Sequence, residues 1–125
     1  MLDSYQLLAK ELAPDGIVCY FQQDGQMVVS SQRGPAWPDR GNSFWVTHHD
    51  DQWFLFAWTN IGYRIPQATD MAAVCRACMN HGTKAMYRVP PDIVRQFGLT
   101  ELSEEEADAA TQHVGSGDRE EQQDL

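Results

Sequence analysis

The chain has 125 residues, 42% of them apolar and four of them tryptophan, which suffices for one domain with a core and argues against general disorder. The 18 acidic residues outnumber nine basic ones, giving a formal charge of −9, so the basic surface that nucleic-acid binding requires is missing. No apolar run approaches the roughly 20 residues that cross a bilayer, so we expect no membrane association.

Residues 3–12, "DSYQLLAKEL", predict an amphipathic helix. Asp3 and Gln6 have the spacing of a capping box, and an apolar stripe follows at helical intervals. Pro14, Asp15 and Gly16 end the helix. This N-terminus lacks the basic start and uninterrupted apolar stretch of a secretory signal, so we expect a cytoplasmic protein.

The next part of the chain predicts two β-hairpins. "IVCYFQ" and "QMVVS" flank Asp24-Gly25, which suits a tight turn, and "SFWVTHH" and "QWFLFAW" flank Asp50-Asp51. Residues 32–41 between the hairpins are rich in Gly, Pro and Arg and predict a long loop that carries Trp37. Asn60 to Gly62 then turn the chain into "YRIP", giving about five consecutive antiparallel strands.

A helix is predicted from about Asp70 to Asn80, with Thr69 as its cap and Gly82 beyond its end. "KAMYRV", residues 84–89, alternates like one more strand. Pro90-Pro91-Asp92 opens a short helix that Gly98 closes.

The C-terminal quarter carries the charge imbalance. Residues 1–100 hold nine acids and eight bases, whereas residues 101–125 hold nine acids and one base. Ser103 and Glu106 predict a capping box before an acidic helix over 101–114. Residues 115–125 predict a disordered acidic tail, so the globular domain is assigned to residues 1–100.

These elements predict a single α+β domain with an antiparallel sheet of five or six strands in mostly meander order. An N-terminal helix, one packed central helix and C-terminal helices complete it. The layout is similar to small adaptor and secretion-chaperone-like domains, a likeness that assigns no residue a role.

The stretch "AVCRACMNHG" has the spacing in this chain that most resembles a thiol or metal site, with Cys75 and Cys78 followed by His81. Both cysteines lie in the apolar stripe of the predicted helix, and free cysteine is often buried, so we interpret them as core. The alternative is a thiol or metal site of Cys75, Cys78 and His81, with Cys19, His48 or His49 as a fourth ligand. Cys75 lies too far along the helix for its N-terminus to activate the thiol.

A second group, His48, His49, Asp50 and Asp51, combines imidazoles with carboxylates, as acid–base or metal sites do. The same residues are ordinary at a hairpin tip, because Asp side chains bond to nearby backbone amides. We therefore assign no catalytic residue, metal or cofactor, and keep this group as an alternative enzyme site.

The aromatic residues of the second hairpin alternate so that both faces of each strand are apolar. This pattern indicates a second layer, a dimer or a binding surface, or simple burial under the N-terminal helix and the long loop. A small apolar ligand between helix and sheet is a further alternative. Tryptophan is a usual anchor of protein interfaces, so the predicted partner-binding residues are Trp37, Trp45, Trp53 and Trp58.

The sequence thus favours a non-enzymatic protein-binding module of adaptor, chaperone-like or toxin-neutralising type. Its expected partner is another protein. The acidic residues near the C-terminus suit a basic partner, and a homodimer is an alternative. The alternative function is a metal- or thiol-dependent enzyme built on either of the two groups above.

Overall fold

The structure is a computed structural model that describes residues 3–21, 26–30, 43–81 and 87–110. Its labelled elements are α1 (Ser4–Leu12), the 3₁₀ helix η1 (Ala13–Asp15), β1 (Val18–Phe21), β2 (Met27–Ser30), β3 (Ser43–His49), β4 (Gln52–Phe56), β5 (Gly62–Arg64), α2 (Met71–His81), α3 (Pro91–Phe97) and β6 (Thr100–Glu101). A further helical stretch covers residues 104–110. None of the helices in this described part of the chain has the length and apolar character of a membrane-spanning segment.

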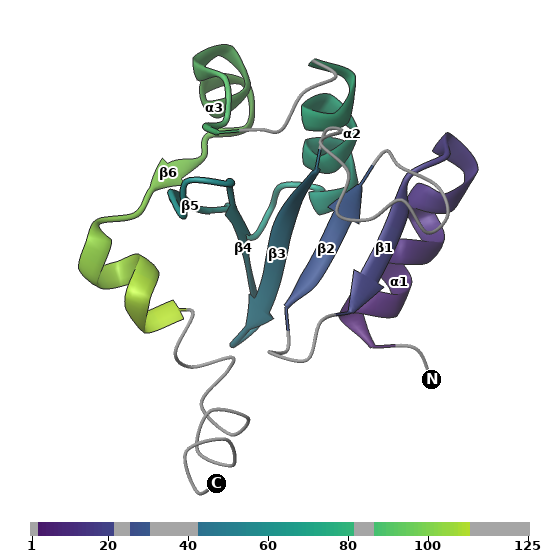
Figure 1. Cartoon of the computed structure of the whole chain (residues 1–125), viewed down its shortest axis with the longest axis horizontal. Coiled ribbons are helices and arrows are strands. Elements are labelled where there is room, and N and C mark those ends of the chain that lie inside the picture. Colours follow the sequence, from purple (N-terminus) through teal and green to yellow (C-terminus); the bar gives the residue numbers. More distant parts are fainter. Residues whose placement is uncertain (1–2, 22–25, 31–42, 82–86, 111–125) are drawn as a thin grey trace, which may run out of the picture.

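The six strands form one antiparallel sheet in the order β1-β2-β3-β4-β5-β6, so every strand pairs with its neighbour in sequence. This meander, with α1 before it, confirms the predicted α+β fold class (Figure 1). Asp50 and Asp51 form the turn between β3 and β4, with φ angles of 52° and 61°. A two-residue hairpin turn of this hand matches the twist of the strands, and Asp tolerates it. The Asp24-Gly25 turn lies outside the described residues.

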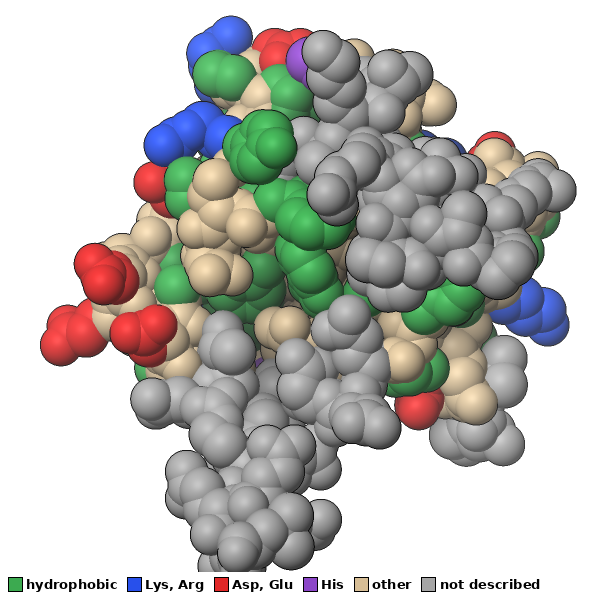
Figure 2. All heavy atoms as spheres, in the orientation of Figure 1, with side chains coloured by type: hydrophobic (Ala, Val, Ile, Leu, Met, Phe, Trp, Pro, Cys, Tyr) green, Lys and Arg blue, Asp and Glu red, His purple; other side chains and the backbone are tan. Residues whose placement is uncertain are grey.

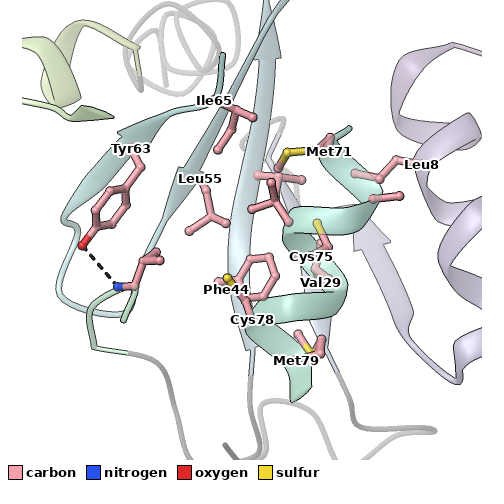
Figure 3. Packing of buried hydrophobic residues seen from close by; sticks show 14 of the residues in the cluster. Leu8, Val29, Phe44, Leu55, Tyr63, Ile65, Met71, Cys75, Cys78 and Met79 are labelled. Carbon is pink, nitrogen blue, oxygen red and sulfur yellow. Dashed lines mark hydrogen bonds between the residues drawn. The ribbon is translucent and has the colours of Figure 1, made fainter. Parts of the chain in front are cut away.

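One face of the sheet, here called the inner face, packs against α1 and α2 and forms the main core (Figure 1). Figure 3 shows Phe44 and Leu55 of the sheet opposite Cys75 and Cys78 of α2. All four side chains are at most 1% exposed, and they are continuous with Leu8 of α1. The amphipathic patterns of both helices are therefore explained by burial against one sheet face.

The N-terminal cap of α1 is as predicted, but that of α2 is not. Asp3 Oδ1 accepts from the Gln6 amide at 2.8 Å, and Gln6 Oε1 accepts from the Asp3 amide at 3.0 Å. In α2 the prediction of Thr69 as cap is wrong, because Asp70 Oδ1 accepts from the Ala72 amide at 3.1 Å. Thr69 Oγ1 donates instead to the Phe97 carbonyl and thereby links this segment to α3.

The strand predicted over 84–89 is wrong for its described part. Tyr87 and Arg88 form bends, and residues 84–86 lie outside the described residues. Val89 is 1% exposed and its amide donates to the Tyr63 hydroxyl, so this segment is bound to β5 through a side chain (Figure 3). The place beside β5 is taken by Thr100 and Glu101, which form β6.

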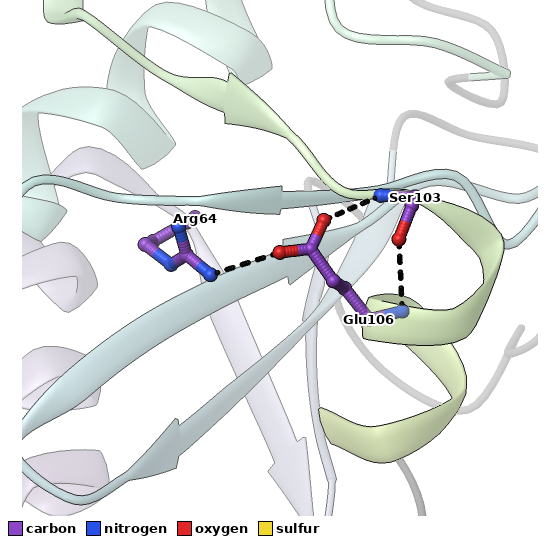
Figure 4. A network of polar contacts seen from close by, with 3 residues as sticks. All are labelled: Arg64, Ser103 and Glu106. Carbon is purple, nitrogen blue, oxygen red and sulfur yellow. Dashed lines mark hydrogen bonds and ion pairs between the residues drawn. The ribbon is translucent and has the colours of Figure 1, made fainter.

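The opposite face of the sheet, here called the outer face, is partly covered by the helix over 104–110. Phe56, Leu102 and Ala110 form a second buried cluster, and Trp45 and Phe54 pack against it. The predicted capping box is present: the Glu106 amide donates to Ser103 Oγ, and the Ser103 amide donates to Glu106 Oε1 (Figure 4). The long loop expected on this side falls within 31–42 and, like residues 111–125, is outside the described residues.

Candidate functional site: an acidic cleft between α1 and the β3–β4 turn

A cleft of about 380 Å³ opens between α1, the turn from β3 to β4, and the segment that leads from β5 into α2. α1 contributes one stripe at helical spacing, from Ser4 to Glu11. Its apolar lining is Leu7, Leu8, Trp53, Ile65, Pro66, Met71 and Ala72. Its carboxylates are those of Glu11, Asp51 and Asp70, and we call it the acidic cleft.

Two side-chain amides hold the segment between β5 and α2, which is the third wall of the acidic cleft, to the β3–β4 hairpin. The Gln52 amide nitrogen donates to the carbonyl of Ile65, and the Gln67 amide nitrogen donates to the carbonyl of Asp51 at 3.3 Å. These bonds hold the segment after β5 beside the β3–β4 turn, although the two are more than ten residues apart in sequence. The wall is thus built by long-range bonds rather than by one secondary structure element.

Tyr5 joins α1 to the end of β3. β2 begins at Met27, which lies opposite Val46, so no residue of β2 lies opposite His48. The amide and carbonyl groups of His48 on this side of β3 therefore have no partner in β2. The Tyr5 hydroxyl takes both: it accepts from the His48 amide at 2.6 Å and donates to the His48 carbonyl at 3.3 Å. Burial raises the pKa of the Tyr5 phenol, and the bond from the His48 backbone partly offsets this rise.

Replacing Tyr5 by phenylalanine is expected to lower the free energy of unfolding by about 1–2 kcal/mol, because both backbone groups of His48 lose their partner while the ring stays. The measurement is chemical denaturation of the purified protein. Tyr87→Phe is the matched control, since Tyr87 is 64% exposed and should tolerate loss of its hydroxyl. Equal stability of the two variants would contradict the bridging role.

His48 and Trp53 line the acidic cleft, and the Tyr5 ring packs against Trp53. The Trp53 ring lies 5.4 Å from that of Tyr5 and 4.7 Å from that of His48, both in edge-to-face geometry. Trp53 and His48 are cross-strand partners, so they share the inner face of the sheet at its end. The cluster gives the cleft a rigid aromatic wall.

The described residues that line the acidic cleft include three carboxylates and no Lys or Arg. Asp70 is committed to capping α2, whereas Glu11 and Asp51 are exposed. Arg76, which donates to the Glu11 carbonyl, has its guanidinium 2.7 Å from the Asp15 carboxylate. The local field of the cleft therefore favours a positively charged ligand group.

The structure splits the predicted group of two histidines and two aspartates. His48 and Asp51 line the acidic cleft. His49 Nε2 instead lies 3.1 Å from Asp50 Oδ2, and the Asp50 side chain is 85% exposed at the tip of the turn. The four residues therefore do not surround one common point.

Cys75 and Cys78 lie in the core, as predicted from the helical stripe. Figure 3 shows both sulfur atoms on the side of α2 that faces the sheet. Burial raises the pKa of the Cys78 thiol to about 12 and that of Cys75 well above its ordinary value, so neither forms a reactive thiolate near neutrality. His81 is exposed at the end of α2, 3.9 Å from an Asp92 oxygen. Within the described ranges, no three His, Cys, Asp or Glu side chains are placed to hold a metal ion.

The predicted binding tryptophans occupy two different faces. Trp53 is on the inner face beside the acidic cleft, whereas Trp45 and Trp58 are paired on the outer face with ring centroids 5.0 Å apart. The Trp58 indole donates to the Ser43 carbonyl at 2.9 Å, which fixes its ring. All three are half-buried, and Trp37 lies outside the described residues.

Comparison with known proteins finds no matching family, no similar curated protein and no similar solved structure.

Sequence reasoning did not identify Glu11 and Asp70 as members of a site. The sequence does place Glu11 seven residues after Ser4, and residues seven apart lie on the same side of a helix. That its stripe faces the β3–β4 turn depends on tertiary packing, which no local pattern reports.

Proposed function

We propose that the protein is a non-enzymatic protein-binding module of adaptor, chaperone-like or toxin-neutralising type, and that it holds a basic segment of its partner in the acidic cleft. The observation that carries the proposal is the combination of Glu11 and Asp51 with an apolar lining and the Trp53 wall. A lysine or arginine side chain suits such a site, because its apolar stem packs on apolar groups while its charged end reaches a carboxylate. Arginine can also stack on an aromatic ring.

The outer face supports the same function as a second contact area. Hydrophobic side chains gather on this face in front of the sheet (Figure 2). Trp45, Phe54 and Trp58 are among its half-buried aromatic residues. Tryptophans of this kind are frequent anchors of protein interfaces. The thiol and metal alternatives gain no such support, since Cys75 and Cys78 face the core.

The test measures binding of fluorescent peptides to the full chain. Peptides that alternate arginine with leucine are expected to bind, and peptides with glutamate in place of arginine are not. Changing Glu11→Gln and Asp51→Asn together is expected to weaken binding about tenfold, since each rim charge contributes about 0.5–1 kcal/mol. Added salt should weaken wild-type binding in the same direction.

The matched control is Glu104→Gln with Glu105→Gln, which removes the same charge from two exposed side chains of the helix over 104–110, outside the cleft. This control is expected to bind basic peptides almost as tightly as the wild type. If both double variants weaken binding equally, only the net charge matters and the acidic cleft is not the site. If neither does, the carboxylates have no role.

A further inference from the structure

Among the described strands, β1 lies at one edge of the sheet and pairs with β2 (Figure 1). In a strand, alternate residues point their amide and carbonyl groups away from the paired neighbour, so an edge offers a row of backbone groups to another strand. Proteins usually protect such edges with charged residues, proline or a bulge. β1 reads Val-Cys-Tyr-Phe and pairs with β2 in unbroken register, so the four described residues of this strand include no charge, proline or bulge.

The opposite edge is different. β6 has only two residues, and it is followed by the helix over 104–110. Its Glu101 carboxylate lies 3.0 Å from the Arg88 guanidinium, which places charge at this edge. Among the described residues, the β6 edge is therefore short and carries charge, whereas the β1 edge has four uncharged residues.

A groove of about 390 Å³ lies between α1 and β1 on the inner side of this edge. Its lining is uncharged and mostly small: Ala9, Ala13, Gly16, Ile17, Val18 and Cys19. A strand added to β1 would place every second side chain on this side of the sheet. The groove offers those side chains an apolar seat beside the backbone bonds, which is how augmented sheets gain specificity.

Phe21, at the end of β1, supplies a side chain that fits this seat. It is 57% exposed, although one edge of its ring meets Tyr5 at 5.3 Å between centroids. We propose that β1 pairs antiparallel with β1 of a second copy, so that the sheet continues through a two-fold axis and Phe21 of each copy enters the groove of the other.

Residues directly opposite each other in an antiparallel pair point to the same face, so the two-fold axis passes through a residue of β1. Only an axis at Cys19 or at Tyr20 pairs three of the four β1 residues with β1 of the second copy. The first choice sets Phe21 opposite Ile17 of the second copy, and the second sets it opposite Cys19. Both are groove residues, so either register seats the exposed ring.

The described C-terminal acidic side chains do not lie at this contact. Those from Glu101 to Asp108 belong to β6 and the helix over 104–110, at the opposite end of the sheet from β1 (Figure 1). The groove uses Ala9 of α1 and Ala13 of η1, whereas the acidic cleft uses the stripe from Ser4 to Glu11 on α1. The dimer and the proposed peptide binding can therefore fail independently of each other.

The test is sedimentation velocity of the full chain over a concentration range of about a hundredfold, because association depends on protomer concentration. The wild type is expected to shift from monomer to dimer. Phe21→Lys should raise the dimer dissociation constant at least about tenfold, since it replaces the seated ring by a charge. Tyr87→Lys changes another exposed aromatic residue away from β1 and should dimerise like the wild type. A wild type that stays monomeric, or a Phe21→Lys variant that dimerises normally, overturns the proposal.

Oxidative cross-linking tests the strand pairing itself. With an axis at Cys19, the wild type forms a covalent dimer that Cys19→Ser abolishes. With an axis at Tyr20, the variant Cys19→Ser with Tyr20→Cys forms it instead. Cys19→Ser with Val18→Cys is the control, because the two introduced thiols would not face each other in either register. Failure of both pairs to cross-link, or equal cross-linking by the control, overturns the edge-to-edge arrangement.

Discussion

Replacing Cys75 and Cys78 together by serine is expected to lower the free energy of unfolding by about 2–4 kcal/mol, because two hydroxyl groups would enter an apolar core. Both thiols are at most 1% exposed and face Val29 and Phe44 of the sheet (Figure 3). A serine hydroxyl in a helix can bond to the preceding turn, which keeps the cost at the lower end for each site. Urea denaturation monitored by tryptophan fluorescence gives the value.

Asn80→Ser is the matched control for the cysteine variants, since Asn80 is exposed on the same helix and its change should stay within about 0.5 kcal/mol. Elemental analysis of the wild type and the serine variant separates the core interpretation from a metal site. A serine variant as stable as the wild type that had lost a bound metal would contradict the core interpretation. Loss of stability with unchanged metal content supports it.

The sequence predicts the parts of this fold whose causes are local. The capping boxes at Asp3 and Ser103 are read from spacing alone, because the bonds join residues three apart. The turn at Asp50-Asp51 is equally local, since Asp tolerates the left-handed backbone that a two-residue hairpin needs. Alternation then assigns the two faces of each strand, as the structure confirms for Phe44 and Trp45.

Where tertiary pairing decides, sequence reasoning fails in both directions. "KAMYRV" alternates like a strand, yet Val89 is bound through the Tyr63 hydroxyl. Thr100 and Glu101 have no marked strand pattern, yet they pair with β5 because the chain after α3 returns to that edge. The same limit applies to the acidic cleft, whose three walls come from separate parts of the chain.

Register also explains why the three described tryptophans, Trp45, Trp53 and Trp58, do not form one surface. Alternation puts Trp53 on the same face of the sheet as Leu55, and Trp58 on the same face as Phe54. It does not say which of these two faces is the inner one. The pairing of His48 with Trp53 settles this and sends Trp53 to the inner face. The aromatic residues beside the cleft and those on the outer face are thus two separate surfaces. Alternation alone does not assign either set to the inner or the outer face.

Replacing Gly62 by valine is expected to lower the free energy of unfolding by about 2–3 kcal/mol, the cost of overpacking a closed site. A Cβ atom at Gly62 would lie 2.6 Å from Phe56 Cε1 and 3.1 Å from Leu102 Cδ1. The Phe56 ring is 4% exposed under the 104–110 helix, so it cannot move aside without disturbing that cluster. The Gly62 carbonyl also accepts from the Leu102 amide at 2.8 Å, which joins the same two parts of the chain.

The variant should therefore loosen the C-terminal helix from the outer face before the inner core unfolds. A protease specific for glutamate is expected to cut Gly62→Val faster within 104–106 than the wild type, while urea denaturation reports the total loss. Combining Gly62→Val with Phe56→Leu should recover at least about 1 kcal/mol relative to the sum of the single changes, because the smaller side chain removes the clash. Strict additivity, or an unchanged cleavage rate, would show that the contact of Phe56 with the backbone at Gly62 does not hold this helix in place.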